Sequence, residues 1–171
     1  AAEGYAYYAL YPEAYLEAAR AARAAAPGPR RAIGIRSIGA GLAAIVARAC
    51  DAPLPATVRP RGDPHRRRIA AAPALAREWA APGATIAIVD EGPGLSGSSF
   101  GAVIDALAAA GVPEARIELY PGHAGEPGPA ASDADRARWR RLPRRVVTDV
   151  PARVAARALA ELVGPLDPGS G

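Results

Sequence analysis

Two adjacent acids, Asp90 and Glu91, follow directly on a short apolar run, Ile86–Val89, and precede a loop of small residues. An apolar run of this length predicts a buried strand, which puts both carboxyl groups at the end of that strand. The loop, residues 92–99, holds three glycines and three serines, so it offers backbone N–H groups and hydroxyls with little side-chain bulk. We expect a helix over Phe100–Ala110, whose positive N-terminal end faces whatever the loop holds.

The chemistry of this stretch suits a phosphorylated sugar. Free amides, hydroxyls and the helix dipole converge in the loop, and this combination binds phosphate groups. The carboxylates of Asp90 and Glu91 suit sugar hydroxyls or a hydrated Mg²⁺ ion. A phosphate site beside a polyol site predicts a sugar-phosphate ligand, although any α/β domain with a glycine-rich turn between strand and helix gives a similar pattern.

A second strand–loop–helix unit lies earlier in the chain. Arg31–Ile35 predicts a short strand and Gly39–Cys50 a helix, with the loop of residues 34–41 between them. The glycines of this loop allow the backbone to come close to a ligand. Taken alone, the loop is equally well explained as a plain turn between a strand and a helix.

An arginine-rich segment stands between the two units. Ala56–Arg61 and Arg66–Ile69 predict a β-hairpin whose turn is Gly62–His65. Its positive charge comes from five arginines: Arg59, Arg61, Arg66, Arg67 and Arg68. These side chains either contact an anionic ligand or form a solvated basic loop, and His65 is most simply a turn residue.

In this order the three units resemble the type I phosphoribosyltransferases. An apolar strand, two acids and a Ser/Thr-Gly-x-Ser/Thr loop, here Ser96–Ser99, are similar to the family's signature for phosphoribosyl pyrophosphate. Residues 34–41 resemble the family's pyrophosphate loop, and the arginine-rich hairpin stands where the family carries a mobile hood loop. The resemblance covers residues 31–123, and Gly92-Pro93-Gly94 replaces a more hydrophobic run of the family pattern.

The resemblance implies an enzyme, a phosphoribosyltransferase that moves phosphoribose to or from a nucleobase-like acceptor and uses Mg²⁺. It implies three catalytic residues: Asp90, Glu91 and Arg36. The two acids would hold the ribose hydroxyls and contact the metal indirectly, through substrate and water. The other residues implied to bind substrate are Gly94, Leu95, Ser96, Gly97, Ser98 and Ser99 for the 5′-phosphate, Ser37, Ile38 and Gly39 for pyrophosphate, and Arg59 and Arg61 for the charge of pyrophosphate.

The acceptor side is marked by Tyr120 and His123, which lie at and just beyond the end of a strand expected over Arg116–Tyr120. In the family this region contacts the base, but each residue also has a simple structural interpretation, as a packed tyrosine and a loop histidine. The main alternative function is a relative without catalysis that senses a nucleotide or sugar phosphate. A dinucleotide-binding oxidoreductase is disfavoured because no Gly-x-Gly-x-x-Gly opens the first helix, and a basic interaction module is a further hypothesis.

Alternating strands and helices predict a single α/β domain over residues 1–164, followed by a flexible tail at residues 165–171. We expect a mainly parallel, Rossmann-like sheet with helices on both faces, of the type I phosphoribosyltransferase kind, so that both loops lie at the carboxyl edge. Further elements are expected outside the motifs: helices over Glu13–Ala25, Pro73–Ala81, Ser132–Arg141 and Pro151–Val163, and a last strand over Arg145–Val150. The early tyrosines either cap the core or line a pocket: Tyr5, Tyr7, Tyr8, Tyr11 and Tyr15.

Composition limits the partners. The 171 residues include 21 arginines and no lysine, with a net charge of +4, which fits an anionic ligand. Nucleic acid is disfavoured because no helix carries a concentrated basic face with interleaved aromatics. One cysteine excludes an internal disulfide, and no apolar run reaches 18 residues, so we expect a cytoplasmic protein without a membrane segment. A homodimer is compatible with the sequence.

Overall fold

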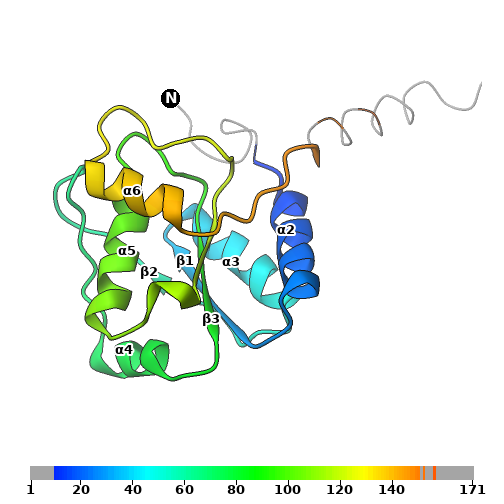
Figure 1. Cartoon of the computed structure of the whole chain (residues 1–171), viewed down its shortest axis with the longest axis horizontal. Helices are drawn as coiled ribbons and strands as arrows, with labels where there is room; N and C mark the ends of the chain where they lie inside the picture. Colours follow the sequence, from blue (N-terminus) through cyan, green and yellow to red (C-terminus); the bar gives the residue numbers. More distant parts are fainter. Residues whose placement is uncertain (1–9, 151, 153–155, 157–171) are drawn as a thin grey trace, which may run out of the picture.

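The computed structural model describes residues 10–150 together with residues 152 and 156. In chain order the elements are α2 (Pro12–Ala25), β1 (Arg30–Ile35), α3 (Ile38–Ala49), β2 (Ala56–Val58), α4 (Pro73–Ala80), β3 (Thr85–Val89), α5 (Ser98–Ala109), the short 3₁₀ helix η1 (Glu114–Arg116), β4 (Ile117–Tyr120) and α6 (Asp133–Arg141). Figure 1 shows the helices arranged on either side of a central sheet.

In the described part of the chain, four strands form one parallel sheet in the order β2-β1-β3-β4. Helices α4, α5 and α6 lie on one side of this sheet and α2 and α3 on the other (Figure 1). The α/β class with helices on both faces is therefore confirmed. Because all four strands run the same way, the segments that follow β1, β2, β3 and β4 all start at one edge of the sheet, which is the edge where such folds bind ligands.

The two faces of the sheet are packed differently. Ile86 and Ile88 of β3 belong to a core of large side chains shared with α4, α5 and α6, where Trp79 and Phe100 are fully buried. Ala87 and Val89 point to the other face, where α2 and α3 contribute mostly alanines. The whole apolar run of β3 is buried because helices cover both sides, as is usual for a parallel strand.

A buried ionic contact joins α2 to the sheet. Arg30, at the start of β1, lies with its Nε 3.4 Å from Oε2 of Glu118 on β4, and both side chains are more than nine-tenths buried. The same guanidinium donates to the carbonyl oxygens of Ala22 and Ala26 at the end of α2. Arg145 supplies a second cation, 2.6 Å from Oε1 of Glu118. This contact therefore connects four segments of the chain.

The prediction of a strand over Arg145–Val150 is wrong. Only one parallel bridge forms there, between Leu119 and Arg144, and the chain then leaves the sheet. The reason lies in β4, which is followed by Pro121. Proline has no N–H group, so the ladder of hydrogen bonds on this side of β4 cannot continue.

The expected hairpin is also shorter than the sequence indicates. β2 covers three residues, and beyond it a single antiparallel bridge joins Arg61 to Arg68. The main helix α5 starts at Ser98, two residues earlier than expected. Several predictions lie wholly or mostly outside the described residues: the helix Pro151–Val163, the tail 165–171, and Tyr5, Tyr7 and Tyr8. Within the described residues, no helix has the length and apolar character to cross a membrane.

Replacing Glu118 by glutamine should destabilise the protein, because Arg30 would remain buried without a counter-charge. Breaking a buried ion pair from one side typically costs about 3–5 kcal/mol, so we expect a loss of that order in urea denaturation. The matched control is Glu114→Gln, which removes a surface partner of Arg141 and should leave stability nearly unchanged. Equal losses in the two variants would contradict a structural role for the buried contact.

Candidate functional site

The two glycine-containing loops meet at the carboxyl edge of the sheet. β1 and β3 are neighbours, and Gly39, in the first turn of α3, packs directly on the end of β3. A Cβ atom on Gly39 would collide with the carbonyl oxygen of Val89 and would lie 2.9 Å from Oδ1 of Asp90. A Cβ atom on Gly34 would in turn lie 2.6 Å from the carbonyl oxygen of Gly39. Only glycine at these two positions allows so close an approach.

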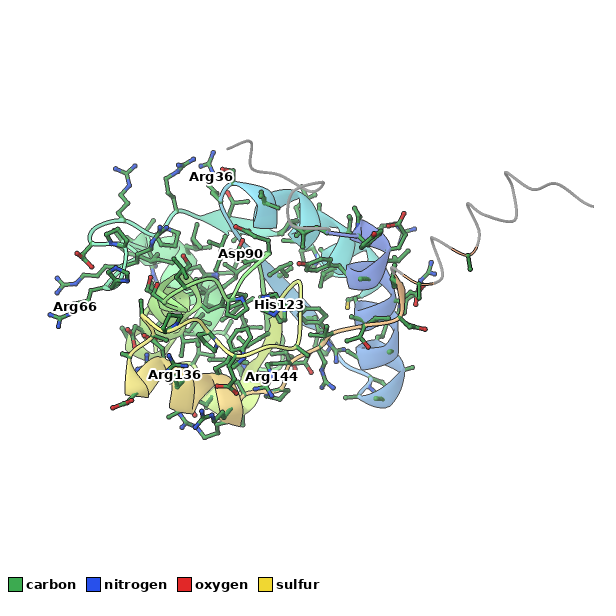
Figure 2. All side chains as sticks on the ribbon, turned by 90° about the horizontal axis from the view of Figure 1, so that it is seen from above. Arg36, Arg66, Asp90, His123, Arg136 and Arg144 are labelled. Atoms are coloured by element: carbon green, nitrogen blue, oxygen red, sulfur yellow. The ribbon has the colours of Figure 1, made fainter. Side chains whose placement is uncertain are left out.

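The residues just before Gly39 belong to the loop that the sequence analysis expects to hold pyrophosphate. Arg36 and Ser37, joined by a cis peptide bond, are exposed at the end of β1, and Ile38 is half-buried. In Figure 2, which views the molecule from above this edge, the Arg36 side chain points outward from the same region of the molecule that carries Asp90. The expected pyrophosphate loop and the acidic pair are thus brought together.

The backbone of Asp90 is held from two sides. Its N–H group donates to the carbonyl oxygen of Tyr120 on β4 at 3.2 Å. Its own carbonyl oxygen accepts a hydrogen bond from the hydroxyl of Tyr15 on α2 at 2.9 Å. The position of this acid therefore depends on the docking of α2 as well as on the sheet.

The two carboxyl groups share an unusual environment. Asp90 is only 7% exposed, and this burial raises the pKa of its carboxyl well above the ordinary range, as do the hydrogen bond and the repulsion from Glu91. The positive charge of Arg67 acts in the opposite direction. Within the described part of the chain, Oε2 of Glu91 is buried without a hydrogen-bond partner. The raised pKa favours a protonated Asp90 whose proton is directed to Glu91, so the two carboxyl groups act as one hydrogen-bonded pair.

The loop of residues 92–99 turns into α5 through glycines. Gly94 and Gly97 have φ values of 64° and 66°, and Gly97 precedes the first residue of the helix. Leu95 is largely exposed, whereas Ser98 is buried. The first N–H groups of a helix have no partner within the helix, so the turn around Ser99 offers donors to an anion.

The serine hydroxyls of this loop are engaged by the arginine-rich hairpin. The hydroxyl of Ser98 donates to the carbonyl oxygen of Pro64 at 2.6 Å. The hydroxyl of Ser96 lies 3.1 Å from the same oxygen and 2.9 Å from Oγ of Ser98, and its single proton is donated to one of the two. The sequence does not reveal this contact, because it joins residues more than thirty positions apart.

A second segment covers the loop from the other side. The N–H group of Gly128 donates to the carbonyl oxygen of Gly94 at 2.9 Å, and that of Gly122 lies 3.2 Å from the carbonyl oxygen of Glu91. The indole N–H of Trp139 fixes the segment by donating to Gly125. The sequence predicted the helix over Ser132–Arg141 within this segment but not its packing on the loop; the glycines of the segment were the available signal of close packing.

Arginines divide into two groups by their partners. Those of α6 and the following residues are used in contacts with other parts of the chain: Arg136 with Pro127 and Gly128, Arg138 with Asp105, Arg140 with Glu126, Arg141 with Glu114, Arg144 with Trp139, and Arg145 with Glu118. By contrast, within the described residues six guanidinium groups at the carboxyl edge form no hydrogen bond or ion pair: those of Arg36, Arg59, Arg61, Arg66, Arg67 and Arg68. Arg66 points away from the body of the protein (Figure 2).

The two residues expected on the acceptor side differ in placement. Tyr120 is fully buried, its hydroxyl lies 3.2 Å from Oε2 of Glu118, and burial raises its pKa. Its ring packs within the core and is not presented at the edge of the sheet. His123 is exposed, and its Nδ1 accepts from the N–H group of Gly125 at 3.1 Å.

A small cavity opens beside His123. It has a volume of about 190 Å³ and is lined by Tyr11 and Tyr15 of the α2 region and by Val146 and Val147. Tyr15 connects this cavity to the acidic pair, because its hydroxyl donates to the backbone carbonyl oxygen of Asp90; neither acid lines the cavity itself. The early tyrosines were expected either to cap the core or to line a pocket, and Tyr11 and Tyr15 line this cavity. The valines were missed because the sequence assigns them to a strand.

The donor set fits a Mg²⁺ ion that arrives with its substrate. Across residues 10–150, 152 and 156, no group of three or more His, Cys, Asp or Glu side chains is placed to hold a metal by itself. Mg²⁺ is commonly held by one or two carboxylates together with substrate phosphates and waters. Asp90 and Glu91 would supply such a pair once Asp90 has lost its proton, and Oε2 of Glu91 is buried without a hydrogen-bond partner in the described residues.

A comparison with models of known protein families finds no match, and a search of curated proteins finds none either.

Adding a methyl group at Gly39 should separate the two loops. We expect Gly39→Ala to destabilise the protein by about 1–3 kcal/mol, the usual cost of overpacking, because its Cβ would press on the end of β3. Gly41→Ala is the matched control on the same helix, where the position is exposed; alanine there should stabilise the helix by up to about 1 kcal/mol. Thermal denaturation of both variants checks the prediction, and a neutral Gly39→Ala would contradict the close contact.

Asp90→Asn should become more stable relative to the wild-type protein as the pH rises. The folded-state pKa of Asp90 is raised, so the stability of the wild type is fully present below the unfolded-state pKa and is lost as the pH rises toward the folded-state value. The difference can grow by at most about 1.4 kcal/mol per pH unit for one proton. Urea denaturation between pH 5 and pH 9 measures it, and a constant difference between the proteins would disprove the raised pKa.

Proposed function

We propose that the protein is a phosphoribosyltransferase-like enzyme that uses 5-phosphoribosyl 1-pyrophosphate. The observation that carries this proposal is the contact of Gly39 with Asp90. It unites the loop expected to hold pyrophosphate with the acids expected to hold ribose. The positive charge of Arg67 acts on Asp90 at this contact, as an anionic ligand nearby requires.

In the proposed complex each part of the ligand has its own partner. The 5′-phosphate lies on the amides and hydroxyls of Leu95–Ser99, at the positive end of α5. The ribose hydroxyls lie on Asp90 and Glu91, where Oε2 of Glu91, which has no partner within the described residues, accepts from one of them. The pyrophosphate lies on the backbone of Ser37–Gly39, and the preceding residue, Arg36, is exposed and adds positive charge.

The proposed reaction replaces pyrophosphate at the anomeric carbon of ribose. A ring nitrogen of the acceptor forms the new bond to this carbon as the bond to the pyrophosphate oxygen breaks, and the electron pair leaves with pyrophosphate. A bound Mg²⁺ ion would offset the negative charge on the departing group. The exposed arginines of the hairpin supply further positive charge, and Arg67 already influences Asp90. The acids act by orienting the sugar, since positioning alone contributes several kcal/mol to catalysis.

The cavity beside His123 is the proposed site of the acceptor. Its volume of about 190 Å³ exceeds the roughly 150 Å³ of an engineered cavity that holds benzene, so one aromatic ring fits. Tyrosine rings and valines line it, and His123 adds a hydrogen-bonding edge. This composition favours a flat heterocycle such as a nucleobase.

A second candidate is a protein that binds a nucleotide or sugar phosphate without turnover. The observation in its favour is that the hydroxyls of Ser96 and Ser98 already contact the hairpin. Release of pyrophosphate in the presence of candidate bases separates the two functions.

Titration calorimetry with phosphoribosyl pyrophosphate, with and without Mg²⁺, tests the proposal directly. We expect saturable binding that Mg²⁺ strengthens and that the double variant Asp90→Asn/Glu91→Gln loses by at least tenfold, or about 1.4 kcal/mol. Asp133→Asn, an exposed acid on α6, is the matched control and should bind like the wild type. Binding that is absent in a folded wild-type chain, or equal in all three proteins, would refute the proposal.

A further inference from the structure

The arginine-rich hairpin has a well-defined tip. Backbone hydrogen bonds of 2.9 Å and 2.8 Å join Arg61 and Arg68. Within the turn, the N–H group of His65 donates to a side-chain oxygen of Asp63 at 2.8 Å. These bonds fix the direction of the Pro64 carbonyl between them.

Hydrogen bonds to the Pro64 carbonyl oxygen join the turn of the hairpin to the loop before α5. This oxygen accepts from Ser98 at 2.6 Å and lies 3.1 Å from the hydroxyl of Ser96, which is also 2.9 Å from Oγ of Ser98. A groove of about 580 Å³ separates the neighbouring arginines, among them Arg66 and Arg68, from α5 and α6. All residues from Arg61 to Arg68 are exposed, so little apolar packing holds the hairpin down.

The two serines cannot serve the hairpin and an anion at once. Each hydroxyl has a single proton to donate. A carbonyl oxygen carries only a partial negative charge, whereas a phosphate group is anionic and gains more from the N-terminal end of α5. A phosphate group therefore competes with the carbonyl and has the electrostatic advantage.

We infer that the Pro64 carbonyl occupies the phosphate subsite as an internal ligand, and that a phosphorylated sugar binds by displacing the hairpin. This inference rests on the proposed function only in taking Leu95–Ser99 as the phosphate loop. The displacement couples two events: the phosphate reaches Ser96 and Ser98, and the hairpin arginines are released to move. The free protein thereby keeps its hood loop fixed on the phosphate loop.

The contact itself is tested without any ligand, by limited proteolysis with trypsin. Mass spectrometry follows cleavage after Arg66 and Arg67 in the wild type and in Ser96→Ala/Ser98→Ala. Both hydroxyls that contact the Pro64 carbonyl are removed, so cleavage there should become about tenfold faster. Ser132→Ala, which removes the capping hydroxyl of α6, should leave cleavage of the hairpin unchanged. Equal rates in the wild type and the double variant would overturn the inference.

The competition is tested with ribose 5-phosphate. In one variant an Asn-Gly turn replaces Gly62–Arg67 and joins Arg61 to Arg68, a pair that a two-residue turn can close. The removed segment has two arginines and one aspartate, a net charge of +1, so Arg67→Ser is a control of equal charge that retains Pro64. We expect the shortened variant to bind about tenfold more tightly than this control.

The outcomes distinguish displacement of the hairpin from the proposed function itself. Equal, measurable affinities in the shortened variant and the control would overturn displacement and leave the proposed function standing. If none of the folded proteins, wild type included, binds ribose 5-phosphate, displacement and the phosphate assignment both fail. Thermal denaturation of the shortened variant verifies that it is folded.

Discussion

The candidate site depends on how closely the turn after β1 approaches the end of β3. Gly34 and Gly39 have no side chains, so the first turn of α3 rests on the backbone of Val89 and Asp90. Parallel pairing of β1 with β3 brings these segments to the same edge. Every other part of the site is arranged around this contact, with Tyr15 supporting Asp90 from α2 and Gly122 closing over Glu91.

Charge is distributed according to the partners that the fold provides. The arginines of α6 neutralise acids or satisfy carbonyl groups on other elements, so they stabilise the covering segment rather than attract ligands. Those that follow β1 and β2 lack such partners in the described part of the chain. In a protein whose only strongly basic side chain is arginine, composition alone does not separate these groups.

The sequence predicted β1, β3, β4 and both loops because their signals are local. The run Ile86–Val89 is apolar at every position, as a strand covered on both faces must be. The same reasoning explains Tyr120, since a strand buried on both faces leaves no exposed side for its ring. The contact of Pro64 with the serines and the exit of the chain after Arg144 were not predictable, because they depend on which distant segments come together.

The alanine-rich packing of α2 has a consequence for the order in which the protein opens. Alanine buries little apolar area, and burial stabilises by about 25 cal/mol per Å², so the α2 layer adds less to cohesion than the face formed by Ile86, Ile88 and Phe100. Amide protons of α2 should therefore exchange with solvent through partial openings well below global unfolding, while those of β3 and α5 are the slowest. Helix α2, which carries Tyr15, would then be the least rigid of the elements that form the site.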